Sequence, residues 1–264
     1  MHRHAILSSA LLVLSVSAAA QDWRHVPGFD TVRQGGMAIG DFDGDGSNEV
    51  AFTATTSSLD YSGIGAYALA VVQEESGEFR RRGLLLSPSR WTSQPISVPS
   101  DGGDRVFSQR PLPDGRGFEF VELTGVPLRP TRTIPSSLEV ALAGVADVDS
   151  DGALELVGLA GYPWGPRQIA IIDATTGATE WIDSVPAQGL GIAQLDTDPA
   201  LELIVRREQG VVIDGATRAQ EWNYPPGFGG LTVVGRFSDA TSIQFASFDA
   251  GALTSRLTIF RGGP

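Results

Sequence analysis

Aspartates that alternate with other residues in one short segment have the clearest chemical meaning in this sequence. Asp41, Asp43 and Asp45 are separated by single residues, and Gly46 follows with the freedom to make a sharp turn. Oxygens at positions 1, 3 and 5 of such a turn converge on one point, and Glu49 at position 9 can close the group. Crowded carboxylates repel one another unless a cation lies among them. The segment therefore predicts a site for a hard divalent cation, and calcium fits it best.

The same pattern occurs a second time in full, later in the chain. Asp147, Asp149 and Asp151 repeat the spacing, and Gly152 again follows them. We expect each of these two loops to bind one Ca²⁺ ion through its carboxylates and through the backbone carbonyl at position 7. The expected ligands are Asp41, Asp43, Asp45, Ser47 and Glu49 in the first loop, and Asp147, Asp149, Asp151, Ala153 and Glu155 in the second.

A third copy is incomplete. Gln194 replaces the first aspartate and Pro199 replaces the glycine. A third Ca²⁺ ion at this loop would depend on the remaining acids, which are Asp196, Asp198 and Glu202. Two further copies, near Asp101 and Arg236, retain too few acidic residues, and we expect no metal there.

The repeat predicts the fold. The five copies begin near residues 41, 97, 147, 194 and 236, and intervals of about 40 to 55 residues are typical of propellers and related arrays. Between the copies lie short β-branched runs bounded by Gly, Pro, Asp and Ser, at about four runs per repeat. We therefore predict an all-β fold, a β-propeller with five blades of four antiparallel strands. A sixth blade would have to lie in the long interval between the first two copies.

Two further repeated features suggest how such a ring would close. The segment Asp173–Trp181 is similar to Asp214–Trp222, and each predicts a hairpin turn followed by an outer strand. The segment Asp22–Phe29 in turn parallels Glu221–Phe228, which begins with such an outer strand. The last repeat lacks one strand, so we expect the N-terminal strand to complete the C-terminal blade. Closure of this kind removes the exposed edges of an open array.

The loops resemble a known family. Ile39–Gly46 and Val145–Gly152 are similar to FG-GAP and VCBS repeats, the calcium-binding blades of integrin α-subunit-like β-propellers. In that family the acidic loop lies between two strands of a blade and holds one calcium ion, and the resemblance implies the same here. Glu49 and Glu155 stand where the family more often has Asp. An EF-hand has similar spacing, but its loop is flanked by helices, whereas strands are predicted here.

The N-terminus has the pattern of a secretory signal peptide. A short basic start precedes the mostly apolar run Ala5–Val16, and the small residues Ser17–Ala20 offer a cleavage site near Ala20. The apolar run is too short to span a bilayer. We expect a secreted or periplasmic monomer without a membrane span, in which residues 1–20 are the signal peptide and residues 21–264 form one domain.

Composition excludes several kinds of chemistry and of partner. The formal net charge of −12 disfavours nucleic acid, because a strongly acidic chain repels phosphates. Cysteine is absent, so disulfides and thiolate sites are excluded. Lysine is absent too, and His25 is the only histidine beyond the predicted signal peptide. The usual nucleophile and base pairs are therefore missing.

Two classes of function remain open. The first is a non-catalytic binding or scaffold module whose ligand is a glycan or a protein. The alternative is a glycan-acting enzyme, a glycoside hydrolase or polysaccharide lyase, that uses two carboxylates. Acids outside the loops that could serve are Asp60, Glu74, Glu75, Glu78, Asp173, Asp183, Asp214 and Glu221. Aromatic residues that could stack on a ligand are Tyr61, Tyr67, Trp91, Tyr162, Trp164 and Tyr224. The scarcity of catalytic residue types favours the first class.

Overall fold

The computed structural model describes residues 31–55, 67–75, 78–87, 91–161, 165–237, 242–250 and 255–261. Within these residues the chain forms 19 strands and no helix, so the prediction of an all-β fold is confirmed. The predicted signal peptide and the predicted closing strand at residues 22–29 lie outside the described residues. In the part of the chain that is described, no helix is long and apolar enough to cross a membrane.

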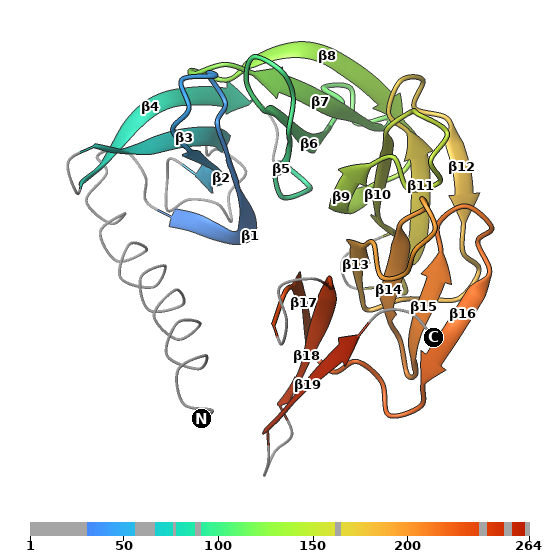
Figure 1. Ribbon diagram of the computed structural model, residues 1–264. Helices are drawn as coiled ribbons and strands as arrows, with labels where there is room; N and C mark the ends of the chain where they lie inside the picture. The colour runs from blue at the N-terminus through green and yellow to red at the C-terminus, as the bar shows by residue number, and fades with distance from the viewer. Residues whose placement is uncertain are drawn as a thin grey trace, which may run out of the picture. The chain divides into compact units, whose positions relative to one another are not determined.

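The strands form five sheets in which neighbours in sequence are hydrogen-bonded neighbours in space (Figure 1). The first sheet contains β1 (Thr31–Gly40), β2 (Glu49–Thr55), β3 (Tyr67–Glu75) and β4 (Glu78–Ser87), and the second contains β5 (Ile96–Val98), β6 (Arg105–Pro111), β7 (Phe118–Thr124) and β8 (Arg129–Ser136). The third contains β9 (Val140–Ala146), β10 (Glu155–Ala160), β11 (Gln168–Asp173) and β12 (Thr179–Ile182), and the fourth contains β13 (Gly189–Ala193), β14 (Glu202–Arg206), β15 (Gly210–Asp214) and β16 (Gln220–Tyr224). The fifth has three strands, β17 (Leu231–Gly235), β18 (Gln244–Ala250) and β19 (Ser255–Arg261).

The chain divides into two compact units. The first comprises Met1–Val106 and Leu123–Thr131, and the second comprises Phe107–Glu122 and Arg132–Pro264. The first sheet belongs to the first unit, and the third, fourth and fifth sheets belong to the second. The boundary falls within strands β6, β7 and β8 of the second sheet.

Five sheets correspond one to one with the five sequence repeats. The long interval between the first two copies is filled by β2, β3 and β4 together with residues 56–66 and 88–90, which lie outside the described part. A sixth sheet does not occur among the described residues. The interval is long because β3 and β4 have 9 and 10 residues, whereas the strands of the fourth sheet have 5 each.

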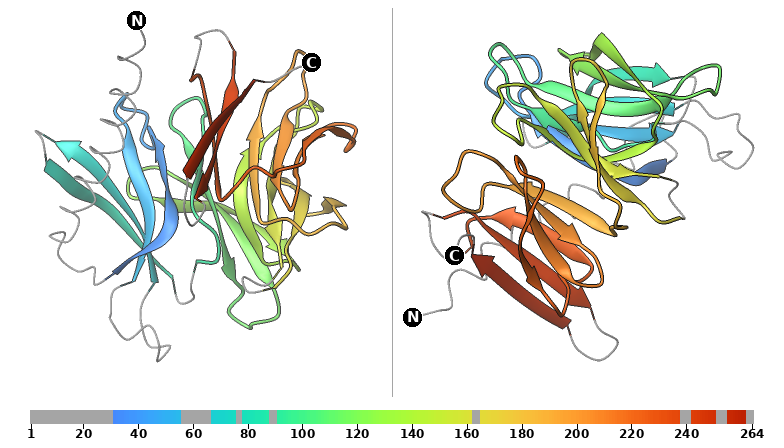
Figure 2. Two further views of the ribbon diagram at one scale, coloured as in Figure 1. Left: turned by 90° about the horizontal axis from the view of Figure 1, so that it is seen from below. Right: turned by 90° about the vertical axis from the view of Figure 1, so that its right-hand side faces the viewer.

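The inner strands of the second unit are buried on both faces. Every residue of β10 and of β15 is buried, and both strands are nearly continuous apolar runs. Alternate residues of β14 face opposite sides of the sheet. Leu203 and Val205 pack with residues of β10 and β11, whereas Ile204 packs with Phe245 of β18. The fourth sheet therefore has one face on the third sheet and the other on the fifth (Figure 2, right).

An aromatic cluster joins the fourth and fifth sheets. Phe228 and Phe245 are fully buried, and Trp222, Tyr224 and Phe260 pack around them with ring centroids 4.6–6.3 Å apart. Tyr224 therefore contributes to packing between these sheets. Trp91, another of the aromatic residues considered for ligand stacking, is a core residue with only 6% of its surface exposed.

Candidate metal centre

Each acidic loop lies between the first and second strands of its sheet. The first loop (residues 41–48) joins β1 to β2, the second (147–154) joins β9 to β10, and the third (194–201) joins β13 to β14. The second strand begins in each case with the glutamate at position 9 of the pattern: Glu49, Glu155 or Glu202. The sheet thus fixes both ends of every loop, and the turn between them brings the acidic residues together.

The first loop gathers its three aspartates. Ligand oxygens of Asp41, Asp43 and Asp45 all lie within 4.8 Å of one another. Asp41 accepts backbone N–H bonds from Gly44, Asp45 and Gly46 at 2.8, 3.0 and 2.9 Å. Both glycines have positive φ angles, 76° and 87°, which side chains disfavour. A hydrogen bond from the Ser47 backbone N–H lowers the pKa of Asp45. The backbone N–H groups of the loop therefore point inward, toward the carboxylates of the loop itself.

Glu49 lies outside this group of three. It is fully buried, and its Oε2 accepts the Phe42 backbone N–H at 2.8 Å. Its Oε1 accepts a bond from the Gln73 amide at 2.8 Å. Burial raises the pKa of Glu49, and the aspartates of the loop raise it further. The structure thus brings together three of the four carboxylates predicted for the first site, while Glu49 fastens the base of the loop.

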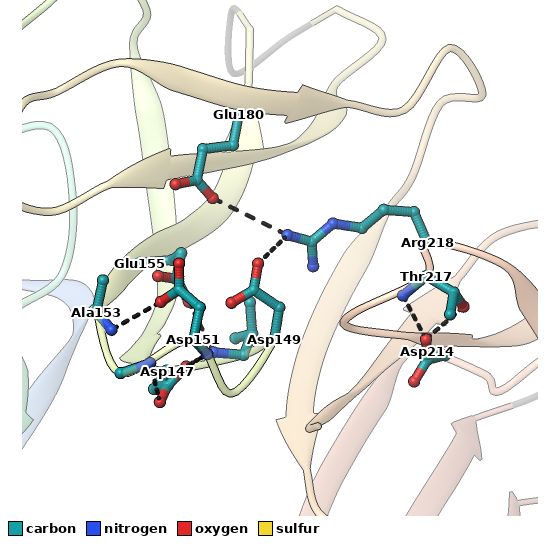
Figure 3. Close-up of polar contacts among 11 residues, drawn as sticks. Asp147, Asp149, Asp151, Ala153, Glu155, Glu180, Asp214, Thr217 and Arg218 are labelled. Atoms are coloured by element: carbon teal, nitrogen blue, oxygen red, sulfur yellow. Dashed lines mark hydrogen bonds and ion pairs between the residues drawn. The ribbon is translucent and has the colours of Figure 1, made fainter. Parts of the chain in front are cut away.

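The second loop gathers all four predicted carboxylates. Oxygens of Asp147, Asp149, Asp151 and Glu155 lie within 4.8 Å of one another (Figure 3). Asp147 accepts the backbone N–H of Asp151 and of Gly152, each at 3.1 Å. Glu155 is 1% exposed and accepts the N–H of residue 148 at 2.7 Å. Burial, opposed by that bond and reinforced by nearby acids, raises the pKa of Glu155 to about 7.

An arginine side chain from another sheet reaches the second loop. Arg218, in the turn between β15 and β16, donates to Asp149 Oδ2 at 3.2 Å and lies 3.9 Å from Glu180 of β12 (Figure 3). Its side chain is 16% exposed, and its φ angle of 62° is unusual for a residue other than glycine. Sequence reasoning missed this contact because 69 residues separate Arg218 from Asp149.

The third loop is closed in a different way. The side-chain amide of Gln194 donates to the carbonyl oxygens of Asp198 and Ala200, at 2.7 Å in the second case. Ala200 occupies position 7, whose carbonyl was expected to bind a metal in the complete loops. The amide therefore takes the place in which a cation would lie within the turn.

The acids around the third loop face neighbouring strands instead. Glu202 belongs to two acidic groups, one with Asp196 and Glu221 and the other with Asp198 and Asp214. Within each group the ligand oxygens lie within 4.8 Å of one another. Glu202 is fully buried, and burial, partly offset by the Leu195 backbone N–H, raises its pKa to about 7. Sequence reasoning had not connected Asp214 and Glu221 with this loop. The signal available was the repeated hairpin, which puts an acid opposite position 9.

Hydrogen bonds tie each of the two complete loops to the following repeat. In the first unit the Asp104 backbone N–H donates to the carbonyl of Asp41 at 2.6 Å. In the second unit the Leu201 N–H donates to Val148 at 3.0 Å. A side chain at Gly103, which has a φ angle of 123°, would place its Cβ 2.9 Å from a backbone oxygen of the first loop. Ordering one loop therefore orders its contact with the next sheet.

The donor set of the complete loops suits a hard cation. All side-chain donors are carboxylate oxygens, which calcium prefers. Asp149 Oδ1 is buried and accepts no hydrogen bond, and a buried oxygen left in this way costs about 1–3 kcal/mol unless something binds it. The residues of the second loop therefore fit a calcium ion, whose +2 charge would neutralise the carboxylates and satisfy this oxygen.

The other acidic candidates have structural partners. Asp183 pairs with Arg207, and Glu75 pairs with Arg82 at 2.8 Å. Asp173 holds the β11–β12 turn by accepting hydrogen bonds from the hydroxyl and the backbone N–H of Thr176, and these bonds lower its pKa. The side chains of Asp60 and Glu78 lie outside the described residues.

Comparison with known proteins gives no independent guide to the family. The chain matches no protein-family model, and a search of curated proteins finds no match. Function is therefore inferred from the geometry of the loops and sheets.

Proposed function

We propose that this chain is a secreted, calcium-stabilised β-propeller that acts as a non-catalytic binding or scaffold module, with a glycan or a protein as its ligand. The observation that carries the proposal is the acidic loop that recurs between the first and second strands of the first, third and fourth sheets. In the second loop four carboxylates converge within 4.8 Å. Clustered negative charge at a repeated structural position is the expected design of a cation-binding array.

Packing within each unit supports the propeller. First strands of successive sheets contact one another: β1 contacts β5, and β13 contacts both β9 and β17. This is the arrangement in which the innermost strands of neighbouring blades surround a central axis. The fifth sheet has three strands where the others have four. We propose that residues 22–29 add the missing strand beside β19, and deletion of residues 21–30 should then lower the melting temperature. An unchanged melting temperature would exclude this role for the segment.

Calcium would stabilise the contact between neighbouring sheets. An ion bound by the second loop would hold the loop in its turn, and the loop is bonded to the next repeat through the carbonyl of Val148. Since the ion binds only the folded chain, it would stabilise the folded state by about 4 kcal/mol when present at a thousand times its dissociation constant. The acidic loops would then serve stability, and ligand binding would fall to other loops of the propeller.

Thermal unfolding with and without chelator tests the proposal. At about 2–4 °C per kcal/mol for a domain of this size, removal of calcium should lower the melting temperature by roughly 10 °C. Asp43→Ala and Asp149→Ala should each remove one equivalent of bound calcium. Asp114→Ala is the matched control, because Asp114 also accepts a backbone N–H in a turn, at 3.0 Å, but belongs to no acidic group among the described residues. No response to chelator would refute the calcium assignment.

The alternative of a glycan-acting enzyme is weaker on this geometry. Such an enzyme needs one protonated and one ionised carboxyl group that both reach the substrate. Glu202 has a pKa of about 7, which would suit a general acid, but its side chain is fully buried. The acidic pocket nearby is lined by Asp149 and Asp198 of the loops themselves, so it is not a cleft separate from them. Hydrolysis or cleavage of a glycan by the purified protein would reverse this ranking.

A further inference from the structure

We propose that Asp198, Glu202 and Asp214 form a third site for a hard divalent cation, built between the third loop and the end of β15. This site differs from the loop sites, because its acids come from two hairpins and the loop interior is occupied by the Gln194 amide. The inference deepens the proposed function and rests on it for the role of the ion, which is to fasten strands together.

The residue that lies opposite position 9 on the neighbouring strand differs between the sheets. The glutamate at position 9 lies directly opposite Gln73 in the first sheet, opposite Asp173 in the third and opposite Asp214 in the fourth. Of these two aspartates, only Asp214 belongs to an acidic group with its glutamate among the described residues. In the first sheet the Gln73 amide donates to Glu49 Oε1 at 2.8 Å. In the fourth sheet Glu202 faces another acid. Like charges directly opposite on neighbouring strands are destabilising.

Glu202 itself has an oxygen without a donor. Its Oε2 accepts the Leu195 backbone N–H, whereas Oε1 is buried and has no hydrogen-bond partner. Ligand oxygens of Asp198 and Asp214 lie within 4.8 Å of the oxygen that Glu202 contributes. Arg218, in the turn that follows β15, is engaged with Asp149 of the second loop and Glu180 of β12. A cation is therefore the missing partner in this group.

Space and access favour a hydrated metal ion. Asp198 and Asp214 line a pocket of about 360 Å³, together with Glu221 and Asp149. A water molecule occupies about 30 Å³ in the liquid, so the pocket can hold an ion with several waters. Asp214 already uses Oδ1 to accept the Thr217 N–H at 2.5 Å, which fixes its carboxylate in place. Oxygen-only donors with room for water suit Ca²⁺ and also Mg²⁺.

The site is tested by counting ions on the full chain. Calorimetric titration and native mass spectrometry with Ca²⁺, and separately with Mg²⁺, should find one ion more than the two complete loops provide. Asp214→Asn should lose that ion, while the Asn oxygen can still accept the bonds of the turn. Asp173→Asn is the matched control, because Asp173 holds the preceding hairpin turn in the same way but belongs to no acidic group among the described residues.

A second variant guards against misfolding of the first. In Glu202→Gln the amide oxygen can accept the Leu195 N–H, and the NH₂ can donate toward Asp214, as Gln73 does toward Glu49. This variant should lose the same ion and melt at a higher temperature than the wild type in chelator. If both variants bind as many ions as the wild type, the third site is refuted.

Loop variants separate this inference from the proposed function. Asp43→Asn combined with Asp149→Asn should leave one ion, and adding Asp214→Asn should remove it. A wild-type chain that binds a single ion, lost in Asp214→Asn, would refute the loop sites and support this one. Two ions, lost only in the loop variants, would do the opposite.

Discussion

Replacement of Glu155 by Gln should change the stability of the protein in opposite senses with and without calcium. Glu155 is 1% exposed, accepts the Val148 N–H at 2.7 Å, and lies among three aspartates. Gln keeps the acceptor and removes the charge. The chain already contains this solution in its fifth sheet, where buried Gln244 accepts the Phe237 N–H at 3.1 Å.

The size of the effect follows from the pKa of Glu155. Burial raises that pKa from an ordinary value of 4.5 to about 7. One pKa unit corresponds to about 1.4 kcal/mol, so ionised Glu155 costs the calcium-free folded state roughly 3 kcal/mol above pH 7. At about 2–4 °C per kcal/mol, Glu155→Gln should raise the melting temperature in chelator at pH 8 by roughly 6–12 °C. At pH 4 the gain should nearly vanish, because Glu155 is then protonated in the unfolded and the folded state alike.

Calcium should remove this gain. The ion needs the charge that Gln lacks, and a tenfold loss of affinity corresponds to about 1.4 kcal/mol. Differential scanning calorimetry in chelator and in millimolar calcium measures both limits for the wild type and the variant. The advantage of the variant in chelator should shrink or reverse in calcium.

A matched substitution provides the control. Glu49→Gln disturbs a residue whose two oxygens already accept bonds from Phe42 and Gln73 and which lies outside the acidic group of its loop. It should therefore destabilise the protein to a similar extent in both buffers. If Glu155→Gln raised the melting temperature equally with and without calcium, Glu155 would not be a ligand and the reasoning about the second loop would be wrong.

Three further outcomes follow from the structure. The calcium-free protein should lose stability as the pH rises from about 4.5 through 7, because Glu155 and Glu202 have raised pKa values in the folded state and their ionisation therefore disfavours folding. Urea unfolding that showed greater stability at pH 8 than at pH 5 would contradict this. Arg218→Gln should tighten calcium binding by the second loop several-fold, since an ion pair worth about 1 kcal/mol no longer competes. Arg110→Gln, which removes a pair that includes no residue of the acidic loops, should leave the titration unchanged. Phe245→Ala should cost about 3–5 kcal/mol of unfolding free energy in chelator and calcium alike, because it opens the aromatic cluster; a calcium-dependent loss would mean that the cluster and the ions are coupled.

Local pattern was enough to predict the strands and the places where the acidic loops occur. Short β-branched runs between Gly, Pro and Asp specify strands, since side-chain periodicity and turn residues act over a few neighbours. For the same reason the alternation of Asp147, Asp149 and Asp151 predicts carboxylates that converge, and the structure brings them together. The spacing of the repeat likewise gave the number of sheets among the described residues.

Partners from other strands depended on the tertiary structure. Glu49 and Glu155 have the same sequence setting, yet only Glu155 joins the aspartates of its loop, because Gln73 on the neighbouring strand engages Glu49. Strand register placed Asp214 opposite Glu202, and packing between sheets carried Arg218 to the second loop. Spacing along the chain fixes which oxygens can share a turn, whereas register and sheet packing decide which charges they meet.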